Sequence, residues 1–149
     1  MAKNVADLLN AKKKQLTTIT PDKSVQDAVN TMVELRIGSL VVIGKDHDLA
    51  GIMTERDVLR QCAKNANRLS EVKVGEVMTK EVIVGKLDDS VKFVEETMTA
   101  RHIRHLPIVE GNKVTGMISI GDVVRSMMDE SSAEADDLRD RLAGHYVVA

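Results

Sequence analysis

The sequence predicts an α/β protein made of two copies of one small sandwich unit, in which helices cover one face of a sheet. The first observation is a repeated phrase, because residues 51–58 are GIMTERDV and residues 116–123 are GMISIGDV. The second is that a shift of 66 residues places Ser24 on Ser90 and keeps many later positions aligned. The third is that each copy alternates apolar spacing typical of a helix with short aliphatic runs typical of strands. Two copies are too few to stack as a solenoid, so a duplicated domain is the better interpretation.

Length and composition fit such a pair. The chain has 149 residues, of which 43% are hydrophobic and 30% are charged, as in an ordinary soluble globular protein. Each copy is small for a domain that would fold alone. We place the first unit at residues 5–64, the second at 74–128 and a tail at 129–149, in which Leu138 and Leu142 favour a short helix.

Composition also narrows the compartment and the classes of partner. A single cysteine, Cys62, rules out an internal disulfide framework and fits a reducing compartment. No apolar run approaches membrane-spanning length and the first residues form no signal-peptide pattern, so we expect a cytoplasmic protein and no membrane partner. A net charge of −2 and the presence of only one Phe and one Tyr argue against nucleic-acid binding. The run Lys12-Lys13-Lys14 fits a solvated turn.

The elements of the first copy follow from local patterns. A short lead-in helix is expected over 5–9, and a second helix begins after Ser24, which forms a capping box with Asp27. The rest of the copy consists, in order, of a strand over 40–43, a turn over 44–48, a strand ending at 51–53, and a closing helix that carries Val58, Leu59 and Cys62. We expect Cys62 to be a small core residue of that helix.

The second copy repeats this order with two departures. Its lead-in helix is expected over 74–78, and its second helix has Ser90 alone as cap, because Phe93 stands where the acid would be. A strand over 106–109, a turn, a strand ending near Gly116 and a closing helix follow. The other departure is Val84-Gly85-Lys86-Leu87, where the first copy has Thr18-Ile19-Thr20-Pro21.

The repeated phrase has two interpretations. In the simpler one, Thr54 and Asp57 form a capping box at a helix start, as do Ser119 and Asp122. In the other, a glycine-ended strand lets a ligand approach the backbone, the helix start and hydroxyl attract phosphate, and the aspartate accepts from ribose hydroxyls. Recurrence of the whole phrase in both copies favours a nucleotide site over a cap alone.

The order of these features resembles the cystathionine-β-synthase (CBS) domain, written twice in tandem. The segments ITPDKSVQDAV and IRHLPIVEGNKVTGMISIGDVV are typical of that family, and the resemblance covers about residues 5 to 128. It implies two units related by a pseudo-two-fold axis, with two clefts that bind AMP, ADP, ATP, NAD or S-adenosylmethionine. It also implies a homodimer formed through helices. The whole chain is most similar to small stand-alone bacterial proteins made of one such pair.

The resemblance also implies roles for individual residues. It places ribose at Asp57 and Asp122, ribose or phosphate at Thr54 and Ser119, adenine at Ile37 and Ile103, phosphate at Gly38, Ser39, Arg104 and His105, and backbone contacts near Lys14 and Lys80. Arg56 and Gly121 share one position of the phrase, so the two clefts should differ. We expect Arg104 to carry phosphate charge in the cleft of Asp122, and Arg56, helped by Arg60, in the cleft of Asp57.

These observations favour a regulatory module that binds adenine nucleotides and acts in trans on an unknown client. An enzyme is disfavoured, because His102 and His105 have no third metal ligand and Cys62 has no evident activator. The alternative is a ligand-independent scaffold of the same fold, which would bind no nucleotide. Retention of both aspartates and both hydroxyls argues against that alternative.

Overall fold

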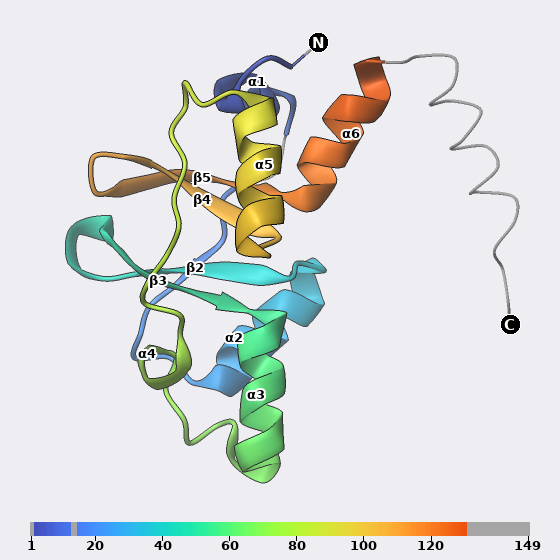
Figure 1. Ribbon diagram of the computed structural model, residues 1–149. Coiled ribbons are helices and arrows are strands. Elements are labelled where there is room, and N and C mark those ends of the chain that lie inside the picture. The colour runs from blue at the N-terminus through green and yellow to red at the C-terminus, as the bar shows by residue number, and fades with distance from the viewer. Residues whose placement is uncertain (1, 13–14, 131–149) are drawn as a thin grey trace, which may run out of the picture.

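The computed structural model describes residues 2–12 and 15–130, with side chains up to residue 128. Lys14 and all but the first two residues of the tail at 129–149 lie outside the described part, and so does the helix expected in that tail. Figure 1 shows two units stacked one above the other, each with a strand hairpin and helices beside it. The predicted two-unit α/β architecture is confirmed.

The elements alternate as the repeat predicts. In chain order they are α1 (Val5–Ala11), β1 (Thr18–Ile19), α2 (Val25–Leu35), β2 (Ser39–Ile43), the 3-10 turn η1 (Lys45–His47), β3 (Leu49–Thr54), α3 (Glu55–Asn65), η2 (Ala66–Arg68), α4 (Val74–Val77), α5 (Val91–Arg101), β4 (His105–Glu110), β5 (Lys113–Ser119) and α6 (Ile120–Glu130). β1 runs parallel to β2, β2 is antiparallel to β3, and β4 is antiparallel to β5.

The second unit departs from the first where its sequence departs. In place of β1 it has a single parallel bridge, between Gly85 and Ile108. A Cβ at Gly85 would lie 2.9 Å from the side chain of Leu106, so a larger residue there would force Leu106 to shift. Glycine weakens a strand, which explains why a full strand does not form at this position.

Both second helices begin and end as their sequences dictate. Ser24 Oγ accepts from the Asp27 amide at 3.0 Å and Asp27 accepts from the Ser24 amide at 3.1 Å, which confirms the capping box. Ser90 caps α5 alone, through the amide of Phe93 at 3.0 Å. The two helices end at Arg36 and His102, which have left-handed φ values of 56° and 54°. The two helices thus end in the same backbone conformation.

Each short lead-in helix packs against the other unit. The core around β4 and β5 includes Val5 and Leu8 of α1, and the core around β2 and β3 includes Val74 of α4. Backbone bonds anchor both helices, from Val5 N to Asp89 O at 2.9 Å and from Val74 N to the Lys23 carbonyl at 2.8 Å. The two units therefore exchange helices, and neither buries its core without the other.

The prediction that Cys62 lies in the core is wrong. Cys62 is exposed, and Leu59 on the same helix is 68% exposed. Figure 1 shows α3 running away from the end of β3. Asp57, at the start of the helix, is the residue of α3 that is buried. No helix within the described residues is both long enough and apolar enough to cross a lipid bilayer.

Candidate functional site

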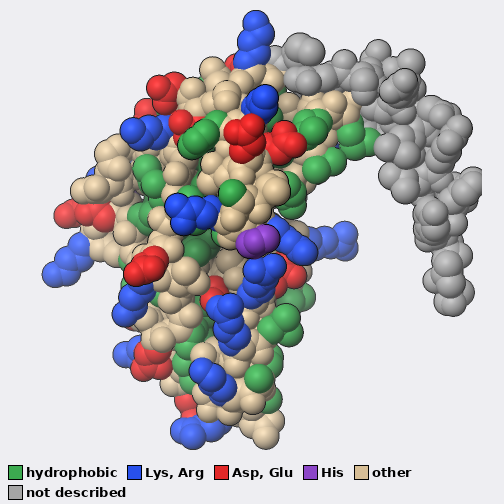
Figure 2. Space-filling model, in the orientation of Figure 1, with side chains coloured by type: hydrophobic (Ala, Val, Ile, Leu, Met, Phe, Trp, Pro, Cys, Tyr) green, Lys and Arg blue, Asp and Glu red, His purple; other side chains and the backbone are tan. Residues whose placement is uncertain are grey.

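Two clefts lie where the units meet, and each takes residues from both repeats. The larger, with a volume of about 760 Å³, contains Asp122 and is called here the Asp122 cleft. The smaller, of about 460 Å³, contains Asp57 and is called the Asp57 cleft. Figure 2 shows basic side chains gathered around a histidine where the end of α5 meets the start of α3.

Each cleft combines the phrase of one repeat with the strand entry of the other. The Asp122 cleft joins Ser119 and Asp122 to Ile37, Gly38 and Ser39. The Asp57 cleft joins its carboxylate, with Thr54 and Arg56, to Ile103, Arg104 and His105. Gly38 and His105 line both clefts. Lys80 and Gly121 fall outside the lining, although Thr79 and Glu81, on either side of Lys80, line the Asp57 cleft.

The expectation that Arg104 serves the Asp122 cleft is wrong. The Arg104 carbonyl accepts from the Ile120 amide at 2.8 Å, so its backbone lies against the start of α6. Its side chain nevertheless lines the Asp57 cleft, together with Arg56 and Arg60. Alignment of the repeats alone does not show on which side of the backbone this side chain lies.

Asp57 is a helix cap whose other oxygen faces the cleft. It is 3% exposed, and its Oδ2 accepts from the Thr54 amide at 2.8 Å and from the Thr54 hydroxyl at 3.2 Å. Its Oδ1 accepts from the Thr79 hydroxyl at 3.1 Å, and Arg60 lies 3.6 Å away. The capping interpretation and the ligand interpretation are therefore compatible, because they use different oxygens of one carboxylate.

Asp122 has stronger partners. Its Oδ2 accepts from the Ser119 amide at 2.8 Å and from Lys12 Nζ at 2.9 Å, and its Oδ1 accepts from Arg125 at 2.5 Å. Burial opposes the charged form, but the hydrogen bonds from Ser119 and Lys12 outweigh it, so the pKa of the Asp122 carboxyl lies below its ordinary value. The expectation that Lys12 is solvated is wrong, because its side chain is 22% exposed and spans from α1 to this carboxylate.

A sequence profile of the CBS domain matches residues 5–64 and again residues 74–129. The chain belongs to the CBS-domain family.

Its relatives include proteins named for their CBS domains. The mitochondrial CBS domain-containing protein CBSX3 of Arabidopsis thaliana is 38% identical over 131 residues, which are 85% of this chain and 64% of the relative. This chain therefore spans less than two thirds of that protein. A CBS-domain protein of Agrobacterium tumefaciens has a solved structure with 35% identity and a TM-score of 0.80, covering 85% of this chain and 95% of that one. The structure of CBSX2 in complex with AMP has 25% identity and a TM-score of 0.74, covering 86% and 98%.

Between the two clefts of this CBS pair lies a small polar centre formed by Glu55 and His105. A Cβ at Gly38 would overlap a Glu55 carboxylate oxygen and lie 3.4 Å from His105 Nε2, so glycine leaves room for both side chains. Burial lowers the pKa of His105, the nearby charge of Glu55 opposes that shift, and Lys12 and Arg104 add to it. His105 is thus harder to protonate than an exposed histidine. This argues against the expectation that a protonated His105 binds phosphate at mildly acidic pH.

Sequence reasoning missed four residues that shape the clefts of the CBS pair: Lys12, Glu55, Thr79 and Arg125. Glu55 stands inside the repeated phrase, where the second copy has Ile120, and that difference was the available signal. Arg125 stands in register with Arg60. Lys12 and Thr79 lie in the lead-in segments, whose exchange between units no local pattern indicates. Within the described residues, no group of three or more His, Cys, Asp or Glu side chains could hold a metal ion.

Proposed function

We propose that this CBS pair binds adenosine-containing ligands, such as AMP, ADP, ATP or NAD, without converting them, and regulates a client protein in trans. The observation that carries this proposal is the arrangement common to both clefts. In each, a buried carboxylate and a hydroxyl at a helix start face an aliphatic residue of the other repeat, Ile37 in one and Ile103 in the other.

This arrangement matches the chemistry of an adenosine. A carboxylate accepts from ribose hydroxyls, and an aliphatic slot takes the adenine ring without requiring an aromatic partner. The Asp57 cleft adds Arg56, Arg60 and Arg104, whose planar guanidinium groups suit phosphate oxygens. The AMP complex of CBSX2, a relative of the same fold, supports this class of ligand.

Titration of the purified protein tests the proposal. After any retained nucleotide has been released by denaturation and identified by chromatography, refolded protein is titrated calorimetrically with AMP, ADP, ATP, NAD and S-adenosylmethionine. We expect saturable heat with at least one of them and no turnover of the ligand. Absence of both retained nucleotide and binding heat would favour the scaffold instead.

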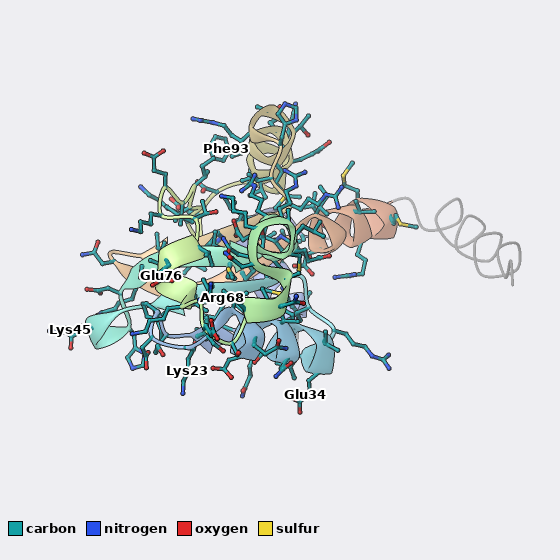
Figure 3. All side chains as sticks on the ribbon, turned by 90° about the horizontal axis from the view of Figure 1, so that it is seen from below. Lys23, Glu34, Lys45, Arg68, Glu76 and Phe93 are labelled. Atoms are coloured by element: carbon teal, nitrogen blue, oxygen red, sulfur yellow. The ribbon has the colours of Figure 1, made fainter. Side chains whose placement is uncertain are left out.

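A ligand-independent scaffold is the second candidate, because apolar side chains stand exposed on the outer helices. Val33 is 73% exposed and Phe93 is 52% exposed, and Figure 3 shows Phe93 on α5 at the edge of the molecule. We infer that such faces join two copies into a homodimer, in the cytoplasm that the single cysteine favours. Sedimentation with and without nucleotide separates the candidates, since a sensor changes its assembly or its client binding with ligand and a scaffold does not.

A further inference from the structure

The two lead-in segments differ in length, and the difference falls beside the clefts. From the first residue of the lead-in helix to the capping serine, the first copy runs from Val5 to Ser24 and the second from Val74 to Ser90, so the first is three residues longer. The extra residues form one more helical turn: α1 has 7 residues and α4 has 4. That extra turn ends at Lys12, which is the C-cap of α1.

In the second lead-in segment, Thr79 completes the Asp57 cleft with neutral groups. Its amide donates to the Ile52 carbonyl at 2.9 Å and its carbonyl accepts from the Ile52 amide at 3.0 Å. Its hydroxyl donates to Asp57 Oδ1 at 3.1 Å. A hydroxyl can rotate, so this bond can be exchanged for one from a ligand at small cost.

In the first lead-in segment, the ammonium of Lys12 contacts the equivalent carbonyl and the equivalent carboxylate, the latter at the oxygen that also accepts from the Ser119 amide. Met117 stands in the repeat where Ile52 stands, and its carbonyl accepts from Lys12 Nζ at 2.8 Å. The same ammonium lies 2.9 Å from Asp122 Oδ2. Lys12 thus brings a partly buried cation to a carbonyl and a carboxylate whose counterparts in the other cleft accept from the neutral amide and hydroxyl of Thr79.

The arginines on the closing helices also differ in distance, because Arg60 lies 3.6 Å from Asp57 Oδ1 and Arg125 lies 2.5 Å from Asp122 Oδ1, but both are exposed. Arg60 and Arg125 each stand three residues after the aspartate and each pairs with it. Both arginine side chains are more than 60% exposed, so a ligand can displace them into water at little cost. Lys12 is 22% exposed, and moving it off Asp122 leaves a buried carboxylate with less compensation.

We propose that Lys12 is a built-in occupant of the Asp122 cleft and sets what that cleft accepts. The Asp57 cleft takes the adenosine part of any ligand. The Asp122 cleft takes adenosine poorly, because Lys12 competes with ribose hydroxyls for the Asp122 carboxylate, and takes a nucleotide whose phosphate groups offer Lys12 another anion. This inference rests on the proposed adenosine binding and adds that the two clefts accept different ligands.

Calorimetric titration of adenosine and of ATP into Lys12→Met tests it. Wild type should bind adenosine at one site, which Asp57→Ala removes and Asp122→Ala leaves, and should bind ATP at two. Lys12→Met should gain a second adenosine site that Asp122→Ala removes, with affinity raised by about tenfold to a hundredfold over the same cleft in wild type. Lys113→Met is the control, because Lys113 pairs with Asp48 on the exposed hairpins and should change neither titration.

Other outcomes overturn the inference. Two equal adenosine sites in wild type, or one adenosine site in a folded Lys12→Met, would show that Lys12 does not restrict the cleft. If Lys12→Met does not fold, Lys12→Gln, which retains a donor for the Met117 carbonyl, is titrated instead; failure of both to fold would make Lys12 a structural support only. Failure of the proposed function is distinct, since wild type would then bind neither adenosine nor ATP.

Discussion

At the scale of single residues, Asp57 is both a cap and a candidate ribose acceptor, and the two roles have different energies. Loss of a cap costs about 1 kcal/mol of stability. Loss of a hydrogen bond to a charged group costs about 1.5–3 kcal/mol, or roughly ten- to a hundredfold in affinity. We therefore expect Asp57→Ala to remain folded and to lose AMP binding at its cleft, as measured by thermal unfolding and calorimetry.

Asp27 is the matched control for Asp57. It accepts from the Ser24 amide at 3.1 Å in the same capping-box geometry and is exposed away from both clefts. Asp27→Ala should therefore cost similar stability and leave binding unchanged. If Asp57→Ala loses stability to the same extent as Asp27→Ala and still binds AMP normally, Asp57 is only a cap.

His105 should make the stability of the protein depend on pH. Because its pKa is lower in the folded protein than in the unfolded chain, its contribution to stability is fully present above the unfolded pKa near 6.5 and is lost as the pH falls toward the folded pKa. Charges of Glu55, Lys12, Arg104 and Asp122 act on this ring. Denaturant unfolding of wild type should show stability falling below neutral pH, and falling less in His105→Gln.

The control for His105 is His102→Asn, which tolerates the left-handed backbone at that position. His102 is exposed at the end of α5. Its replacement should leave the slope of stability against pH close to that of wild type. An equal reduction of the slope in both variants would mean that burial of His105 is not the cause.

At the scale of elements, the junction between α5 and β4 carries Arg104 into the Asp57 cleft. Its charge should act on phosphate and not on the nucleoside, so Arg104→Ala should weaken AMP by about tenfold and leave adenosine nearly unchanged. Arg101→Ala, in the exposed last turn of α5, is the control. Calorimetry of both ligands, alone and combined with each aspartate variant, checks this. A loss that persists after Asp57→Ala has removed the cleft would place Arg104 elsewhere.

The elements themselves were largely predictable, and their mutual placement was not. Capping by Ser24 and Ser90, the aliphatic strands and the closing helices follow from contacts within a few residues, which local sequence encodes. At Gly85 the sequence showed a departure from the repeat but did not show that a strand would be missing there. Which repeat supplies the strand entry to which phrase depends on packing between units, so the side on which Arg104 lies could not be inferred. Lys12 was missed for the same reason, because its partners lie 105 and 110 residues away in the sequence.

At the scale of the whole molecule, the exchanged lead-in helices make each core depend on a segment from the other half of the chain. Leu8 of α1 is 4% exposed in the core around β4 and β5, and Val74 of α4 is fully buried in the core around β2 and β3. Each cleft is bordered by the chain just after one of these helices, at Lys12 after α1 and at Thr79 after α4. Each lead-in segment therefore contributes both to a core and to the border of a cleft.

Shortening one core side chain on each lead-in helix should therefore destabilise first the unit against which that helix packs. Leu8→Ala removes packing worth about 2–5 kcal/mol, a large part of the 5–15 kcal/mol of a typical domain. Hydrogen exchange followed by mass spectrometry should show faster exchange over residues 91–128 in Leu8→Ala and over residues 18–65 in Val74→Ala. Each variant serves as the control for the other. If Leu8→Ala speeds exchange first in residues 18–65, then α1 belongs energetically to its own repeat, and the cores are not coupled through the exchange of helices.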